Sequence, residues 1–290
     1  MSLVQQLLGR VTPCVMGIIN CSPNSFYGAV VDNDQALTLA AQMIAEGAAM
    51  IDVGGEATNP KVDLQVDGPS LQQEIDRVVP VIEAIKQRFD VMVSVDTSQP
   101  QVMLAAINAG VDMINDQRAL TFPGALDIVS QHNVLVCLMH FFNERVPASS
   151  SPQVMFDTIV KDLSAAIERC LAAGIPLTRL IADPGFGQGH YGKNTQENFY
   201  LLSQLPQFKT ALHDLPLLVG WSRKSMIGDV LQSPVAERLY GSVAAATLCA
   251  FLGADIIRVH DVKATVDAIK VVKALQAATT EVDAAVTMKD

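Results

Sequence analysis

The chain has few of the features that mark membrane, secreted or nucleic-acid-binding proteins. No apolar run reaches the roughly 20 residues of a membrane span. The opening MSLVQQLLGR has no basic start followed by an apolar block, so we expect no signal peptide. The 20 Lys and Arg, against 30 Asp and Glu, form no basic block, which disfavours a nucleic-acid partner. An acidic protein can still bind a small anion where a few cations converge.

Cysteine is also scarce, and its five copies are widely spaced with no CxxC pair. An odd number at such spacing disfavours a disulfide framework or a zinc site. The pattern predicts buried free thiols in a cytoplasmic protein. The cysteines are Cys14, Cys21, Cys137, Cys170 and Cys249.

Apolar residues are abundant instead. Half of the chain is hydrophobic and only 17% is charged, as expected for strands that are buried on both faces. Eight short apolar runs each lead to a polar or charged residue and stop there. They cover residues 15–20, 50–52, 91–96, 113–115, 134–140, 180–183, 217–222 and 256–260.

Segments with helical periodicity separate most of these runs. We expect helices over 34–46, 71–82, 101–109, 123–131, 152–173, 197–212, 235–252 and 261–276. Ser70 can cap the second helix, with Glu74 close by. Alternating strands and helices predict a single (β/α)8 TIM barrel, which needs about 250 residues. We predict one domain over residues 1–290, with a core of about 14–276, a short N-terminal extension and a tail that frays after Ala277.

Polar residues end all eight runs. In a parallel barrel these ends meet at one mouth, where such barrels hold their active sites. Any one of these side chains alone could simply bond a neighbouring loop, but eight together predict a functional site. They are Asn20, Asp52, Asp96, Asn115, His140, Asp183, Ser222 and His260.

Three of these residues make an acceptor-rich floor. Asp96 and Asp183 offer only acceptors when ionised, while Asn115 offers donors and acceptors. Such a set suits a flat heterocycle with donors on one edge, such as a guanine-like or pterin ring. A Mg²⁺ site is the competing use of these oxygens, but Asn20, beside a long loop, is the better metal candidate.

Cations follow the last two runs. Loops after strands seven and eight of such barrels often bind phosphate, and Arg258 and His260 supply donors there. The segment 220–225 lacks P-loop glycine spacing. An Arg–Lys pair is usually solvated surface, yet at a strand end Lys224 becomes a candidate ligand group. The glycine-rich loop 183–189 predicts a close approach of the backbone to a ligand.

Together these motifs resemble the dihydropteroate synthase family over nearly the whole chain. The motifs are VMGIINCSPNSF, GAAMIDVGGEATNP, VSVDT, MINDQRAL, CLMH, IADPGFGQG, LLVGWSRKSMIG and RLYGSVAAATLCAFLGADIIRVHDV. The resemblance implies that 7,8-dihydropterin-6-ylmethyl diphosphate and 4-aminobenzoate are joined to give dihydropteroate and diphosphate, with early loss of the diphosphate. It further implies Mg²⁺ as cofactor, a homodimer packed through late helices, and a target of sulfonamide drugs.

The resemblance also assigns roles to residues. It implies pterin binding by Asp96, Asn115, Met139, Asp183 and Lys224, and aminobenzoate binding by Phe26, Thr58, Pro60, Ser222 and Lys224. It implies diphosphate binding by Asn20, Thr58, Asn59, Arg258 and His260, with Asn20 on the metal. The catalytic set would be Asn24, Phe26, Asp96, Asp183 and Lys224.

The chain departs from the family in three loops. Asn24 stands where the family has Asp, and Asn59 where it has Arg, so one negative and one positive charge are absent. Gln188 replaces an apolar residue, and residues 190–192 look inserted before Lys193. These changes keep two alternatives open: a pterin-binding paralogue that has lost or altered the synthase activity, and a barrel related to pterin-dependent methyltransferases.

Overall fold

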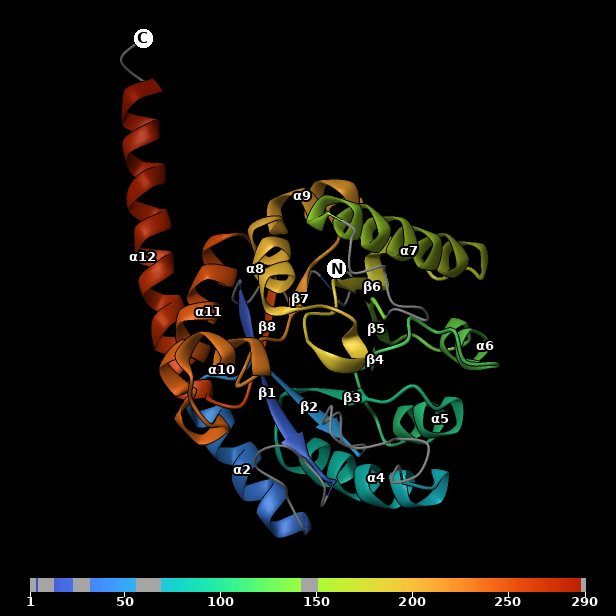
Figure 1. The fold of residues 1–290 in the computed structure, drawn as a ribbon. Helices are drawn as coiled ribbons and strands as arrows, with labels where there is room; N and C mark the ends of the chain where they lie inside the picture. The colour runs from blue at the N-terminus through green and yellow to red at the C-terminus, as the bar shows by residue number, and fades with distance from the viewer. Residues whose placement is uncertain (1–3, 5–12, 23–31, 56–68, 142–150, 288–290) are drawn as a thin grey trace.

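The chain folds into a closed barrel of parallel strands surrounded by helices (Figure 1). The computed structural model describes residues 4, 13–22, 32–55, 69–141 and 151–287, with only the backbone for His190 and residues 280–287. The strands are β1 Cys14–Asn20, β2 Met50–Gly54, β3 Met92–Asp96, β4 Met113–Asp116, β5 Leu135–Met139, β6 Leu180–Asp183, β7 Leu218–Val219 and β8 Ile256–Val259.

The sheet order confirms the predicted fold class. The eight strands run β6-β5-β4-β3-β2-β1-β8-β7, and all pairings are parallel. A parallel bridge between Ala182 and Leu217 joins β6 to the residue before β7 and closes the ring. That residues 1–290 form a single domain stays a prediction.

Helices and short 3-10 turns connect the strands on the outside of the barrel. The helices are α2 Asn33–Ala45, α4 Leu71–Arg88, α5 Pro100–Asn108, α6 Ala125–Ser130, α7 Pro152–Ala172, α8 Thr195–Ser203, α9 Leu205–Ala211, α10 Ser225–Leu231, α11 Leu239–Phe251 and α12 Val262–Thr287. The 3-10 turns are η1 Leu177–Arg179, η2 Gly189–Tyr191 and η3 Val235–Glu237. None of the helices described is both long and apolar enough to cross a membrane.

The helical segments differ from expectation at four places. The expected helix over 197–212 is two helices, because Pro206 in the first turn of α9 has no N–H to continue the bonding of α8. The expected helix over 235–252 is η3 and then α11, divided at Arg238, whose ψ of 10° leaves the helical range. Helix α10 was not expected.

The fourth difference is at the C-terminal end. Helix α12 continues to Thr287, past Ala277 where fraying was expected. Its outer part projects beyond the barrel (Figure 1). No Gly or Pro interrupts residues 262–287, and Ala and Lys, which both have high helix propensity, recur along this segment.

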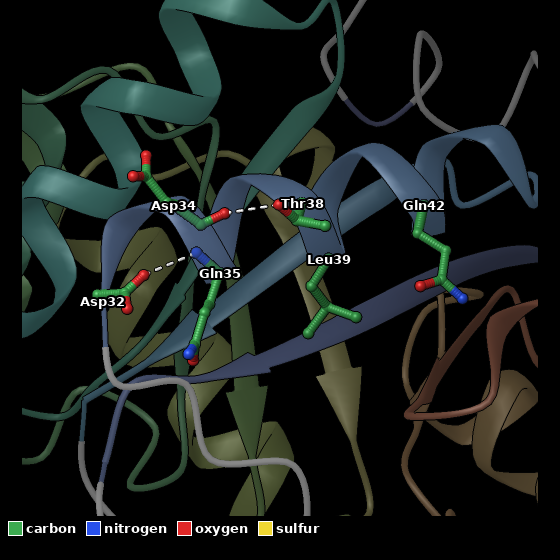
Figure 2. Close-up of a pocket in the computed structure, with 6 residues that line it drawn as sticks. All are labelled: Asp32, Asp34, Gln35, Thr38, Leu39 and Gln42. Carbon is green, nitrogen blue, oxygen red and sulfur yellow. Dashed lines mark hydrogen bonds between the residues drawn. The ribbon is translucent and has the colours of Figure 1, made fainter.

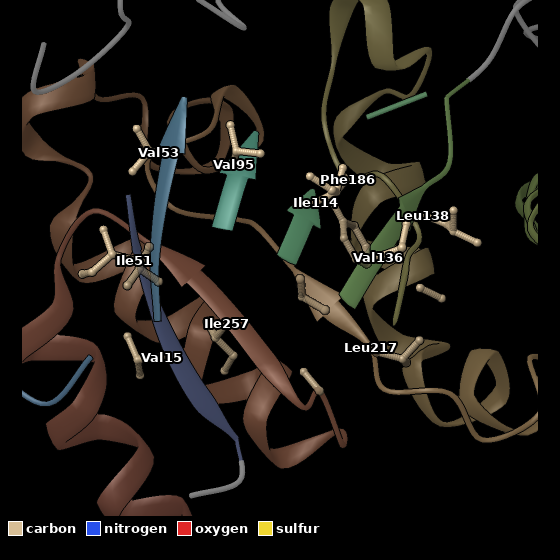
Figure 3. Packing of buried hydrophobic residues seen from close by; sticks show 14 of the residues in the cluster. Val15, Ile51, Val53, Val95, Ile114, Val136, Leu138, Phe186, Leu217 and Ile257 are labelled. Atoms are coloured by element: carbon tan, nitrogen blue, oxygen red, sulfur yellow. The ribbon is translucent and has the colours of Figure 1, made fainter. Parts of the chain in front are cut away.

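Alternation along the strands divides the apolar residues into two cores. On β2, Ile51 and Val53 pack outward against helices, whereas Met50 points into the barrel. The outward set is the larger, and Figure 3 shows part of it around Val95, Ile114 and other strand residues. The inward set fills the barrel with Cys14, Met16, Met50, Met113, Leu135, Cys137, Ile181, Leu218 and Ile256.

Side-chain caps set the starts of several helices. Ser70 caps α4 as expected, but its capping-box partner is Gln73, because that side chain lies at the third helical position. Asn194 and Glu197 form the same box at α8, directly after the loop that follows β6. Asp32 accepts a bond from the Gln35 N–H and starts α2.

Candidate functional site

The site is built by the same alternation that fills the barrel. Residues two apart on a strand share a face, so a polar residue two positions after an inward apolar residue also points inward, nearer the mouth. Four strands place such pairs around the ring. The pairs are Met50 and Asp52 on β2, Met113 and Asn115 on β4, Ile181 and Asp183 on β6, and Ile256 and Arg258 on β8.

Arg258 joins two carboxylates at the mouth. Its Nε donates to Asp52 Oδ2 at 2.6 Å, and its Nη2 donates to Asp96 Oδ2 at 2.8 Å. Asn115 Nδ2 donates to the same Asp52 oxygen at 3.2 Å. Burial lowers the pKa of Arg258, but the charges of Asp52 and Asp96 outweigh it and raise that pKa above its usual value. Asp96 and Asn115, which are expected to bind the pterin, and Arg258, which is expected to bind the diphosphate, are therefore joined in one hydrogen-bonded network through Asp52.

Asp52 was missed as a site residue. Sequence reasoning singled it out only as the polar end of a strand, yet its side chain is fully buried and bonded to both Arg258 and Asn115. The signal was its place two residues after an inward Met50.

Lys224 reaches into the mouth from the segment after β7. Its Nζ donates to the Phe186 carbonyl at 2.5 Å and lies 4.8 Å from the centre of the Tyr191 ring. Burial lowers the pKa of Lys224 to about 8, although Asp183 opposes the shift. Burial also raises the pKa of Asp183, against the Gly185 N–H that donates to it at 2.7 Å. A lysine with such a pKa changes its charge just above neutral pH.

Two side chains, Asn198 and Lys193, hold the loop after β6 in place by hydrogen bonds to the backbone of that loop. The Asn198 side chain accepts from the Gly187 N–H at 2.7 Å and donates to the Gly187 carbonyl at 3.2 Å. Lys193 is buried and donates to the carbonyls of Gly185 at 2.7 Å and Tyr191 at 3.2 Å. Burial lowers the pKa of Lys193 to about 7. At Gly185 the loop packs closely against the chain itself, since an added Cβ would lie 2.1 Å from the His140 carbonyl oxygen. Its close approach to a ligand stays a prediction.

Ser222 and His260 are neighbours on the side of the mouth formed by β7 and β8. The His260 N–H donates to Ser222 Oγ at 3.2 Å, and His260 Nδ1 lies 3.0 Å from the same oxygen. Burial, with Arg258 next, lowers the pKa of His260 to about 3. His260 is therefore neutral near pH 7 and can bind an anion only through a ring N–H, without a charge.

Arg223 has a structural role that its sequence neighbour does not share. It is buried, with Nη2 2.7 Å from Asp261 Oδ1, and it donates to the carbonyls of Val235 and Ala236. The two residues of the Arg–Lys pair therefore have different roles. Arg223 links the segment after β7 to η3 and to Asp261 after β8, whereas the Lys224 side chain enters the site.

The other expected site residues are placed in part. Asn20 ends β1, partly exposed and paired with Gly54. Met139 is buried at the end of β5, in register with Asp183. The expected loop residues Asn24, Phe26, Thr58, Asn59 and Pro60 lie outside the described residues. Within the described part of the chain, no group of three or more His, Cys, Asp or Glu side chains could hold a metal ion.

A separate surface pocket lies on α2 (Figure 2). It has a volume of about 380 Å³ and is lined by Asp32, Asp34, Gln35, Thr38, Leu39 and Gln42. The two carboxylates belong to the helix start, where Asp32 caps the Gln35 N–H at 2.8 Å. None of the expected site residues lines this pocket, and no cation does, so it does not suit the diphosphate.

The mouth of the barrel holds two acidic side chains, an amide and a lysine, and comparisons place the chain among the pterin-binding enzymes. A family model described as pterin binding enzyme matches residues 16–260. The chain is 45% identical over 266 residues to the dihydropteroate synthase of Escherichia coli strain K12, covering 90% of this chain and 91% of that one.

Two solved structures agree in fold and sequence. A dihydropteroate synthase from Coxiella burnetii, in complex with pteroic acid, is 55% identical with a TM-score of 0.86, covering 90% of this chain and 92% of that chain. The Yersinia pestis enzyme, with a sulfonamide drug complex, is 45% identical with a TM-score of 0.84, covering 92% and 95%. The chain belongs to the dihydropteroate synthase family.

Proposed function

We propose that this chain condenses 7,8-dihydropterin-6-ylmethyl diphosphate with 4-aminobenzoate, giving dihydropteroate and diphosphate. The observation that carries the proposal is the continuous polar network of Asn115, Asp52, Arg258 and Asp96, with Asp183 and Lys224 beside it. The pteroic acid held by the Coxiella burnetii relative contains the two halves that this reaction joins.

The pterin ring is assigned to Asp96, Asn115 and Asp183. A pterin edge carries N–H and amino donors, and ionised carboxylates accept from such donors. Lys224, whose charge interacts with that of Asp183, donates to an acceptor of the ring, and its charge also favours the anionic substrates. Met139, in register with Asp183, supplies an apolar surface for the ring.

The bonds that break and form in the reaction determine which groups the other residues of the mouth must bind. The C–O bond to the diphosphate breaks with its electron pair on the leaving oxygen, and the remaining pterin methylene cation is captured by the arylamine nitrogen, which then loses a proton. Arg258 supplies charge for the leaving group, and neutral His260 supplies a ring N–H. Ser222, which is bonded to His260, binds the aminobenzoate carboxylate in this proposal.

Mg²⁺ is the proposed cofactor. The protein oxygens described are too few to hold the ion alone, so the diphosphate of the substrate would supply further oxygen ligands. The described residues hold no cluster of acidic or His ligands for a metal cage. Mg²⁺ commonly takes few protein oxygens and completes its shell with phosphate oxygens and water. Asn20, at the end of β1, would be the protein ligand. When bound, the ion would neutralise charge on the diphosphate.

We also propose a homodimer formed through α11 and α12, which pack side by side (Figure 1). Leu248 and Phe251 on α11 are 48% and 55% exposed, and Val271 and Leu275 on α12 are 69% and 53% exposed. Residues three or four apart share a helix face, so each pair forms an apolar strip. Five free cysteines, all buried, support a cytoplasmic protein.

The test is a turnover assay on the full chain. Pterin diphosphate, Mg²⁺ and 4-aminobenzoate are supplied, and both diphosphate and dihydropteroate are measured. We expect diphosphate release that depends on the arylamine and matches dihydropteroate formation. Pterin binding with no arylamine-dependent turnover would instead support the pterin-binding paralogue.

A further inference from the structure

Two side chains outside the set implied by the resemblance form a bridge across the mouth. Gln117 follows β4 directly, and Tyr191 is the last residue of η2, in the loop after β6. Tyr191 Oη donates to Gln117 Oε1 at 3.3 Å. Gln117 Nε2 in turn donates to the two carboxylate oxygens of Asp96 at 2.9 and 3.1 Å. Three elements are thus joined through side-chain bonds above the barrel.

The ring of Tyr191 is buried and held in one position by its neighbours in this bridge. The residue is only 6% exposed, and Lys224 Nζ lies 4.8 Å from the ring centre. A Cβ at Gly187 would lie 2.5 Å from a carbon of the Tyr191 ring, so glycine is required there. Lys193 holds the Tyr191 carbonyl at 3.2 Å. The same side chain therefore contacts Lys224 by its ring and reaches Gln117 by its hydroxyl.

The bonds also fix the orientation of the Gln117 amide. An ionised carboxylate accepts but cannot donate, so the amide nitrogen must face Asp96. The amide oxygen then faces Tyr191, whose hydroxyl donates to it. A bond from an amide to a carboxylate is charge-assisted and holds the plane of the acceptor. Arg258 also donates to Asp96, with its Nη2 2.8 Å from Oδ2.

We propose that Gln117 and Tyr191 are positioning residues for the pterin substrate, acting through Asp96 and Lys224. The inference rests on the proposed function, because that function assigns Asp96 and Lys224 to the pterin. Gln117 sets the plane in which Asp96 meets the ring, and Tyr191 fixes both that amide and the Lys224 ammonium. The residues that look inserted at 190–192 thereby supply a contact at the site.

The test separates the two arms of the bridge. Tyr191→Phe removes the hydroxyl and keeps the ring, whereas Gln117→Leu removes the amide. Tyr191→Phe is expected to raise KM for the pterin diphosphate about two- to tenfold, the range of one neutral hydrogen bond. Gln117→Leu is expected to raise it more, about ten- to hundredfold, because it also removes the bonds to the charged Asp96. KM for 4-aminobenzoate stays within about twofold. Since both changes break the same bond, the double variant is expected to lose less than the product of the two single effects.

Tyr191→Leu tests the ring contact with Lys224. An aromatic ring stabilises an ammonium beside it, so its loss is expected to move the alkaline limb of the pH–rate profile to lower pH. Tyr191→Phe leaves that limb in place. The charged groups around Lys224, which these variants retain, are Asp96, Asp183, Lys193 and Arg258.

The chain offers a matched control. Tyr200 Oη donates to Gln153 Oε1 at 2.6 Å, which is the same type of bond between α8 and α7. Tyr200→Phe and Gln153→Leu are expected to leave both KM values unchanged. The proposal is overturned if the bridge variants behave like these controls, if their effects multiply independently, or if both substrates lose affinity equally.

Failure of the proposed function would be seen separately, as a wild-type chain without turnover. In that case the same variants are compared by their Kd for the pterin diphosphate. The readout is the fluorescence of Trp221, the single tryptophan of the chain, whose ring centre lies 5.3 Å from that of Phe186. Weaker pterin binding in the bridge variants alone supports the inference, and equal binding in all variants overturns it.

Discussion

Arg223 and Lys224 are adjacent in the chain, and their side chains enter opposite surroundings. Arg223 pairs with Asp261 at 2.7 Å, away from the mouth, while Lys224 donates to the Phe186 carbonyl at 2.5 Å inside it. Arg223 adopts a φ of +57°, which turns the backbone sharply between the two residues. Substitutions at the two positions are therefore expected to separate stability from activity.

Lys224→Ala is expected to abolish most turnover and to leave the fold intact. Removing one charged group that acts on developing charge typically lowers kcat by a factor of about 10² to 10³. The check is steady-state turnover together with thermal unfolding. Lys263→Ala on α12, where the side chain is 60% exposed, is the control and should change neither. Near-normal turnover of Lys224→Ala would remove this residue from the site.

Arg223→Ala is expected to destabilise the protein by about 3–5 kcal/mol, the usual result of removing one partner from a buried ion pair. Arg223 is 4% exposed, and its loss leaves the Asp261 carboxylate and the carbonyls of Val235 and Ala236 without their donor. Urea unfolding measures the difference. A variant that unfolds at the wild-type midpoint would show that these bonds do not support the fold.

The sequence predicts the site residues that lie at the ends of the barrel strands. Asp96, Asn115 and Asp183 were predicted because they end apolar runs that meet at one mouth, and Arg258 because the loops after strands seven and eight often bind phosphate. The fold class followed from the same eight runs. The break between α8 and α9 also had a signal, since Pro206 stands inside the expected helix.

Other contacts could not be read from the sequence. The bond from Tyr191 to Gln117 joins residues 74 positions apart, and it depends on how a loop folds rather than on a repeating pattern. The pairing of Arg223 with Asp261 is likewise set by the turn after β7. Asp52 carried a visible pattern, but its partners lie on other strands, at Asn115 and Arg258.

The buried thiols predict how stability depends on pH. Burial raises the pKa of Cys170 from 9.0 to about 11, so between these values the unfolded chain has lost a proton that the folded chain keeps. The free energy of unfolding then falls as pH rises, by up to about 1.4 kcal/mol per pH unit for each thiol. All five cysteines have raised pKa values and outnumber Lys193 and Lys224, whose lowered pKa values act in the opposite direction.

Cys170→Ala isolates one of these contributions. Urea unfolding under reducing conditions, compared at pH 8.5 and 10.5, is expected to show a shallower fall in the variant than in the wild type. The free energy of unfolding that is lost with the packing of the sulfur does not depend on pH, so it cancels when the two pH values are compared. Parallel pH dependences would show that Cys170 titrates alike in both states.

Gly187→Ala is expected to displace the Tyr191 ring. Gly187 has a φ of +152°, and an added Cβ would lie 2.5 Å from a ring carbon of Tyr191. The variant should therefore raise KM for the pterin diphosphate as Tyr191→Phe does. Gly174→Ala is the matched control, because Gly174 also has a positive φ, +83°, but no atom within 4 Å of an added Cβ. Loss of pterin affinity in the control as well would point to a general effect of backbone strain.

Phe251→Glu is expected to convert the proposed dimer into a monomer. Phe251 is 55% exposed on the strip of α11 beside α12, and a carboxylate there would be desolvated in a twofold interface. Sedimentation velocity at several protein concentrations measures the association state. Val230→Glu on α10 introduces the same charge at an apolar residue of 58% exposure and should leave the dimer intact. A wild-type chain that sediments as a monomer, or a Phe251→Glu variant that remains dimeric, would exclude this interface.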